Sequence, residues 1–187
     1  MSVLVCESSP SYNEFTRLLL CPVPEWSFQA RVANVAQGGS VITQHTQYQL
    51  VVTAVPRNSI DMDVRCFSLW TRFRDLSHLW SQLSKIHQQL YLHGTFPTFA
   101  PAKFFGNSEP SVIAERIEAT GRFLNFVLAS EVLRKTRVLH QFFAAAEEVS
   151  SQIDSTPPLS STNVASSSAA HILEYVLFRC SCYRGHN

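Results

Sequence analysis

The chain carries little net charge. Its 187 residues include 15 Lys and Arg against 14 Asp and Glu, which leaves a formal net charge of +1 at pH 7. Nucleic-acid-binding domains usually carry a clustered basic excess, so nucleic-acid binding driven by bulk positive charge is excluded. Any anion site must therefore be a local cluster of basic side chains.

Long apolar runs are missing as well. No window approaches the roughly 20 apolar residues that a membrane-spanning helix requires, and the N-terminus lacks the basic start of a signal peptide. The five cysteines are odd in number and scattered, which is not the pattern of a disulfide framework and favours a reducing compartment. We expect a cytoplasmic protein whose membrane contacts are peripheral.

Motifs of catalysis and metal binding are absent. The sequence has no His-Glu-x-x-His motif, no P-loop, no dinucleotide fingerprint and no nucleophile elbow. Cys180, Cys182 and His186, two cysteines and one histidine in a tail, make a poor zinc site. These absences predict a protein that is not an enzyme and that holds no metal and no cofactor.

Alternating polar and apolar residues predict three β-strands in the first half of the chain. The first strand begins at Trp26 and is followed by the turn signal Gly38-Gly39-Ser40. The second covers residues 48–55 and stops at Pro56, and the third covers about residues 64–71. Because the connections between these strands are short, they favour an antiparallel meander.

The hydrophobic period then changes to that of a helix. Apolar residues at helical spacing predict an amphipathic helix that starts at about Asp75 and ends at about Tyr91. Pro110 fits the first turn of a second helix, and Ser130 can cap a third. Strands followed by helices, rather than alternating with them, indicate an α+β fold.

Composition sets the expected domain limits. Residues 25–146 contain the predicted strands and helices and suit one domain of ordinary size. The sequence leaves the structure of residues 1–24 open. Serine and proline become frequent after the last helix, so residues 147–187 are predicted to form a flexible tail with a short apolar end at 172–178.

Two segments combine basic and aromatic residues. In residues 69–77, Arg72 stands beside Phe73 where the third strand runs into the first long helix. In residues 96–103, a proline-stiffened loop ends in Lys103. Arginine and lysine can each hold a phosphate, and an aromatic face can support a ring between them. Taken alone, a strand-end arginine is more often structural and a phenylalanine more often belongs to the core.

These two segments, in this order, resemble the signature of the phox-homology (PX) domain, a family that binds phosphoinositide lipids. The resemblance covers residues 26–145. It implies a three-stranded antiparallel sheet followed by a helical subdomain of three or more helices, with a proline-rich loop between the first two long helices.

The amino-acid sequence of residues 104–106 and 111–116 is similar to that of one branch of the family. In that sorting-nexin branch, the PX domain elsewhere precedes a microtubule-interacting-and-trafficking (MIT) or kinase-like C-terminal domain. The short tail has no counterpart of this second domain. The sequence leaves open whether the chain is a truncated or alternatively spliced form that lacks this second domain.

The resemblance also implies roles for individual residues. Arg72 would bind the 3-phosphate of the lipid, Phe73 would stack under the inositol ring, and Lys103 would reach the 1-phosphate. Arg116, early in the second long helix and at the edge of its apolar stripe, would hydrogen-bond the ring hydroxyls. The family usually has tyrosine at the position of Phe73, and phenylalanine keeps the ring face while losing the hydroxyl.

Phe104 and Phe105 directly follow Lys103. They are candidates for shallow insertion into the membrane interface, where basic residues meet anionic head groups. Packing beneath the loop is an equal alternative for these two rings. The family also has another proline in this loop, at the position of Phe99 or Ala100.

The resemblance implies a phosphoinositide-binding module, most readily for phosphatidylinositol 3-phosphate. It would recruit the protein to the surface of early endosomes in membrane trafficking. The alternative is a PX-fold scaffold that binds a protein partner and has weak or broad lipid affinity. The sequence names no such partner, and it leaves lipid selectivity open because selectivity depends on the walls of the pocket.

Overall fold

A computed structural model describes residues 3–5, 12–22, 25–38, 45–57, 62–101 and 108–149 of the chain. Lys103, Phe104 and Phe105 lie outside these ranges, and so does the predicted tail from residue 150 onward.

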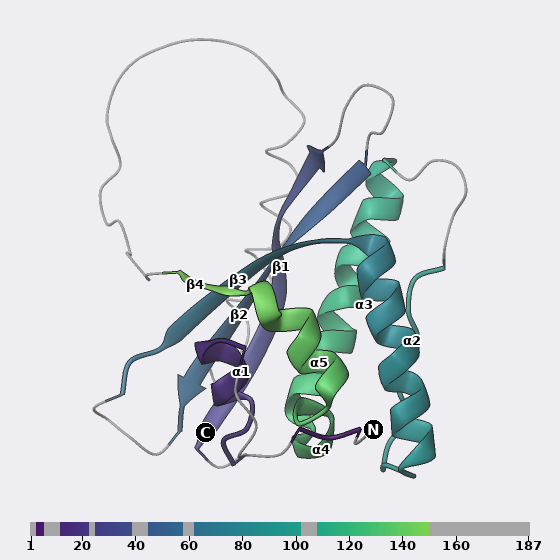
Figure 1. Ribbon diagram of the computed structural model, residues 1–187. Helices are drawn as coiled ribbons and strands as arrows, with labels where there is room; N and C mark the ends of the chain where they lie inside the picture. The colour runs from purple at the N-terminus through teal and green to yellow at the C-terminus, as the bar shows by residue number, and fades with distance from the viewer. Residues whose placement is uncertain are drawn as a thin grey trace, which may run out of the picture. The chain divides into compact units, whose positions relative to one another are not determined.

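The described elements confirm the predicted α+β order, with strands first and long helices after them (Figure 1). In chain order they are α1 (Glu14–Leu18), β1 (Trp26–Gly38), β2 (His45–Pro56), β3 (Arg65–Arg72), α2 (Phe73–Gln89), α3 (Pro110–Ala129), α4 (Glu131–Arg134), α5 (Arg137–Phe142), the 3-10 turn η1 (Phe143–Ala145) and β4 (Glu147–Val149).

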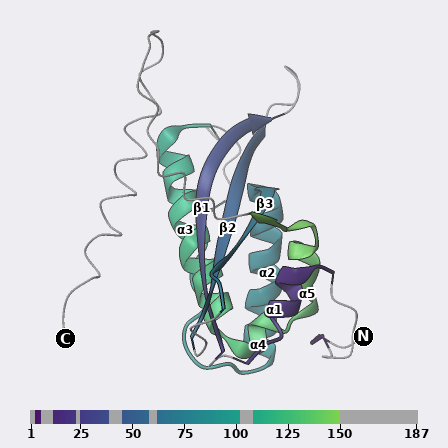
Figure 2. The same ribbon diagram turned by 90° about the vertical axis from the view of Figure 1, so that its left-hand side faces the viewer.

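The three predicted strands form the expected antiparallel meander, and the short strand β4 extends it in the order β1-β2-β3-β4. Along β2 every second residue is buried, and Leu50, Val52 and Ala54 are at most 1% exposed. The helices α2 and α3 pack on this face of the sheet and lie behind the strands in the view of Figure 2. The period-two pattern of β2 therefore identifies the face that meets the helices.

The helix starts follow local chemistry. Helix α2 begins at Phe73, not at Asp75 as predicted, and Arg72 is its N-cap. Asp75 lies in the first turn, where a negative charge favours the helix N-terminus. Pro110 opens α3 as predicted, and the Ser130 hydroxyl accepts a hydrogen bond from the Leu133 N–H at 3.3 Å, as expected of a cap.

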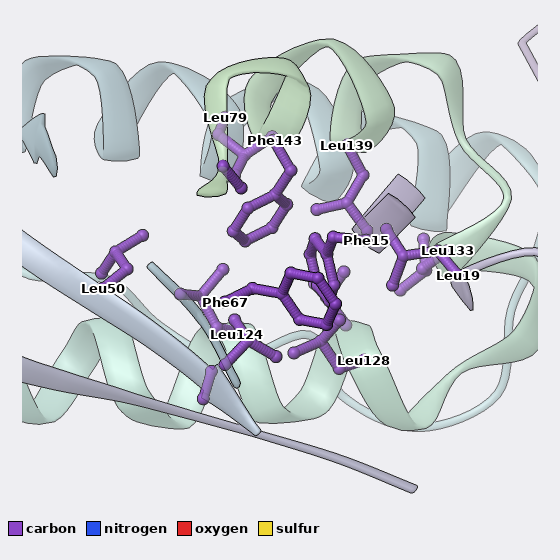
Figure 3. Close-up of a cluster of buried hydrophobic side chains, with 14 of the residues drawn as sticks. Phe15, Leu19, Leu50, Phe67, Leu79, Leu124, Leu128, Leu133, Leu139 and Phe143 are labelled. Atoms are coloured by element: carbon purple, nitrogen blue, oxygen red, sulfur yellow. The ribbon is translucent and has the colours of Figure 1, made fainter. Parts of the chain in front are cut away.

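The helix α1 belongs to the core of the domain, although the sequence left residues 1–24 open. Phe15 is fully buried (Figure 3), and the centroid of its ring lies 4.9 Å from the centroid of the Phe67 ring and 4.9 Å from that of the Phe143 ring. The Asn13 side chain caps α1 and also donates to the carbonyl oxygens of Phe143 and Ala146, at 2.8 and 2.9 Å. A single short helix thus joins the sheet to the C-terminal end of the domain.

The strand β4 corrects the predicted start of the flexible tail at residue 147. Residues 147–149 pair with β3, from Ser68 opposite Glu147 to Cys66 opposite Val149. The Arg65 guanidinium adds a two-point contact to the Glu148 carboxylate, at 2.6 and 2.5 Å. Three exposed residues show no hydrophobic period, so the sequence pattern had no signal for this edge strand.

Asn125 closes part of the β1 edge, which has no neighbouring strand in the described sheet. Its side-chain oxygen accepts from the Ala30 N–H at 2.8 Å, and its amide nitrogen donates to the Ala30 carbonyl at 2.9 Å. The amide thus takes the place of a strand neighbour and satisfies both backbone groups of a residue that is 3% exposed.

Asn125→Leu, which keeps the side-chain size and removes both contacts, is expected to lower the free energy of unfolding by about 1–3 kcal/mol, because two buried backbone groups lose their partners. Urea unfolding measures this loss. Asn34→Ala is the control, since the Asn34 contact to Gln49 is exposed, and it should change stability by less than about 0.5 kcal/mol. Equal effects of the two variants would contradict this role of Asn125.

His140 makes the stability of the domain sensitive to pH. The side chain is 1% exposed, and its Nε2–H donates to the Arg134 carbonyl, 3.0 Å away. Burial holds the pKa of His140 below its ordinary value of 6.5, although the hydrogen bond opposes this shift to a smaller extent. As the pH falls, His140 is therefore protonated in the unfolded chain before it is protonated in the folded one. The contribution of neutral His140 to the stability is full above pH 6.5 and is lost as the pH falls below that value.

We expect the free energy of unfolding to fall between about pH 7.5 and about pH 5.5, and to fall less steeply in His140→Gln. Denaturant unfolding across this range measures the slope. His78 is exposed, so His78→Gln should keep the slope of the parent. A His140→Gln variant with the unchanged slope would show that other groups set the pH dependence.

Candidate functional site

The predicted phosphate-binding arginine lies at the junction of β3 and α2. Arg72 is the last residue of β3, opposite Gln47 in β2, and its side chain makes no capping hydrogen bond. It is exposed, and within the described part of the chain it forms no ion pair. The strand-to-helix turn thus presents a guanidinium that the fold itself does not use.

Phe73 follows at the start of α2 and is half-buried. Its ring stacks on the Phe99 ring with centroids 5.4 Å apart and planes within 6° of parallel. The Arg116 guanidinium carbon lies 3.9 Å from the Phe73 centroid, a cation–π contact. Three segments that are distant in the sequence therefore meet at this ring.

Arg116 is only 4% exposed. The sequence placed it at the edge of the apolar stripe of α3, whereas the structure places it within the buried stripe, in register with Val112, Ala119 and Phe123. A planar guanidinium can be buried here because it lies against an aromatic ring. Its charge is thus held against the ring of the residue that directly follows Arg72 in the chain.

Two further aromatic residues belong to this neighbourhood, and the sequence reasoning gave them no site role. The Trp80 indole N–H donates to the Pro97 carbonyl at 2.8 Å, and the Trp80 ring stacks on Phe99 at 5.9 Å and 16°. Phe73 and Trp80 are seven residues apart on α2, which puts them on one helix face. This spacing is a sequence signal that Phe73 and Trp80 share a face, but only the structure shows that the Phe99 ring lies between them.

The structure thus brings Phe73 and Arg116 together, with Arg72 beside Phe73 in the chain. The other predicted site residues, Lys103, Phe104 and Phe105, lie outside the described residues. In the described ranges, no three His, Cys, Asp or Glu side chains gather as a metal site would require. No helix in those ranges is long and apolar enough to span a bilayer.

Comparison with known proteins identifies the family. Residues 62–146 match the family model of the PX domain, and this segment contains Arg72, Phe73, Phe99 and Arg116. The match, together with the antiparallel sheet followed by helices, identifies a PX domain in this segment of the chain. It confirms the family and the fold that the two sequence segments indicated.

The relatives include both protein types that the local sequence resembles. Ribosomal protein S6 kinase delta-1 of Homo sapiens is 29% identical over 124 residues, which cover 63% of this chain and 12% of that protein. Sorting nexin-15 of Homo sapiens is 29% identical over 120 residues, which cover 61% of this chain and 35% of that protein. The chain therefore matches only a minor part of each of these relatives.

Solved PX domains are similar as well. The mouse SNX19 PX domain with bound sulphate ion matches with a TM-score of 0.47 and 15% identity, over 64% of this chain and 97% of that one. A designed CISK-PX domain matches with a TM-score of 0.48 and 13% identity, over 61% and 96% of the two chains.

Proposed function

We propose that this PX domain binds the head group of phosphatidylinositol 3-phosphate and recruits the chain to the cytoplasmic surface of early endosomes in membrane trafficking. The observation that carries the proposal is the exposed Arg72 beside the Phe73–Arg116 contact. It supplies a cation that the fold leaves available, an aromatic ring, and a second cation within one small area.

Each residue has a role that follows from its chemistry. Arg72 binds the 3-phosphate through charge-assisted, two-point hydrogen bonds, and Lys103 binds the 1-phosphate. The inositol ring rests on Phe73. The Arg116 guanidinium lies over that ring, 3.9 Å from its centroid, so a sugar that stacks on this face takes the place of the guanidinium, which then donates to the ring hydroxyls from the side.

The proposed role is that of a binding module and not of an enzyme. The similarity to S6 kinase delta-1 covers 12% of that protein, so it gives no support for kinase activity in this chain. The similarity to sorting nexin-15 supports a place in trafficking. Recruitment by one head group and shallow insertion is reversible, since neither contact anchors a protein as a spanning helix does.

Co-sedimentation with phosphatidylcholine vesicles tests the proposal. Vesicles that carry phosphatidylinositol 3-phosphate should pellet the protein, whereas vesicles with the same fraction of phosphatidylinositol 4-phosphate should pellet much less. The 4-phosphate vesicles match the charge, so a difference reports the position of the phosphate. Equal pelleting by both, or by vesicles without phosphoinositide, would overturn the proposal and favour the scaffold that binds a protein partner.

The two phenylalanines after Lys103 are proposed to enter the membrane interface. Full burial of one phenylalanine contributes on the order of 1.5–3 kcal/mol, and partial insertion contributes less. The double variant Phe104→Ser, Phe105→Ser should therefore bind vesicles several-fold more weakly and bind a soluble head group as the parent does. Equal losses in the two assays would mean that the rings pack beneath the pocket.

A further inference from the structure

An aromatic column connects three segments of the site. Phe73 and Trp80 lie on one face of α2, about 10.5 Å apart along the helix axis. The Phe99 ring is nearly parallel to both, at 5.4 Å from Phe73 and 5.9 Å from Trp80. With these distances Phe99 fills the space between the two rings, and Arg116 of α3 adds a contact to Phe73.

The loop of residues 96–101 contacts α2 through this column, which consists of Phe73, Phe99 and Trp80. The Trp80 N–H holds the Pro97 carbonyl at 2.8 Å, and Phe99 is inserted two residues later. The Phe99 ring also meets Phe123 of α3 edge-on, at 5.7 Å and 74°. An ordinary apolar contact would tolerate rotation, but parallel stacking on two sides fixes the plane of the ring.

We infer that Phe99 is a positioning residue of the proposed lipid site, which sets the orientation of Phe73. The inference rests on the proposed function. Phe99 supports the Phe73 ring that the sugar would contact, and its own position is fixed by Trp80 and Phe123.

The effect of Phe99 on binding comes from preorganisation. A site whose ring and loop are already in place pays less ordering cost when it binds a ligand. Leucine at this position keeps apolar burial and removes the planar face, whereas tyrosine keeps the face. Affinity should therefore follow the planarity of residue 99 and not its hydrophobicity.

The test compares Phe99→Leu and Phe99→Tyr with a matched control, Phe142→Leu. Phe142 is a half-buried phenylalanine of α5 whose ring meets Phe143 and no residue of the column. Each protein is titrated calorimetrically with dibutanoyl phosphatidylinositol 3-phosphate and melted in parallel. Amide hydrogen exchange of residue 96 and residues 98–100 is measured without ligand. If Phe99→Leu does not fold, Phe99→Met replaces it in the same comparison.

We expect Phe99→Leu to lower the affinity about three- to tenfold and to speed amide exchange in the loop. Phe99→Tyr should keep the lipid affinity and the loop exchange rate of the parent. Phe142→Leu should lower the stability and leave the affinity unchanged. Parent-like affinity of Phe99→Leu, or equal losses of affinity in Phe99→Leu and Phe142→Leu, would overturn the inference and leave the proposed function standing. A parent protein that does not bind the lipid would overturn the proposed function and, with it, the role of Phe99 in binding.

Discussion

Replacing Arg72 with alanine is expected to lower the affinity for phosphatidylinositol 3-phosphate by roughly ten- to a hundredfold, because a charge-assisted contact is worth about 1.5–3 kcal/mol. The melting temperature should not change. Arg72 is exposed, makes no capping hydrogen bond, and within the described residues forms no ion pair. Its removal therefore takes nothing from the fold.

Arg74→Ala is the matched control for this prediction. Arg74 is two residues away, its side chain is 84% exposed, and its loss changes the net charge by the same amount. It should bind the lipid nearly as the parent does, whereas Arg72→Lys should fall between parent and alanine because it keeps the charge and loses the two-point geometry. Parent-like binding by Arg72→Ala would show that the phosphate site lies elsewhere.

Phe15→Ala should cost about 3–5 kcal/mol of unfolding free energy, the range for a large aromatic residue removed from a core. Phe15 is fully buried and its ring meets those of Phe28, Phe67 and Phe143, at 6.2, 4.9 and 4.9 Å. The loss would leave a cavity between the sheet and the C-terminal end of the domain. Urea unfolding at constant pH measures it.

Tyr12→Ala is the control for Phe15→Ala, because Tyr12 precedes the same helix and is 54% exposed. Its stability should stay within about 0.5 kcal/mol of the parent. A chain that starts at residue 25, the predicted domain start, should be destabilised like Phe15→Ala. Should Phe15→Ala instead unfold at the same urea concentration as Tyr12→Ala, α1 would not belong to the cooperative core.

The long elements could be predicted because their own residues repeat. The alternation along β2 and the helical spacing along α2 extend over many residues, so each pattern has one consistent solution. The α1 helix has 5 residues and β4 has 3, too few to show a period. Their places depend on contacts with distant residues, such as Asn13 with Phe143 and Arg65 with Glu148.

The candidate site shows the same division. The placement of Arg72 and Phe73 at the β3–α2 junction was predictable because the junction is local in the chain. The burial of Arg116 could not be predicted. An arginine in an apolar stripe is expected to lie at the edge of the stripe unless an aromatic ring is known to cover it. In the sequence, Phe99 is distinguished only as one of two candidates, with Ala100, for the position of the usual proline. Its stacking partners become visible once α2 and the loop are placed in space.

The most direct test of the central claim is a calorimetric titration of the protein with soluble short-chain phosphoinositides that differ only in phosphate position. The exposed Arg72 beside Phe73 and Arg116 predicts that the 3-phosphate binds at least about tenfold more tightly than the 4- or the 5-phosphate, and that Arg72→Ala removes this preference. Equal affinity for all three lipids, or a preference that survives in Arg72→Ala, would contradict it.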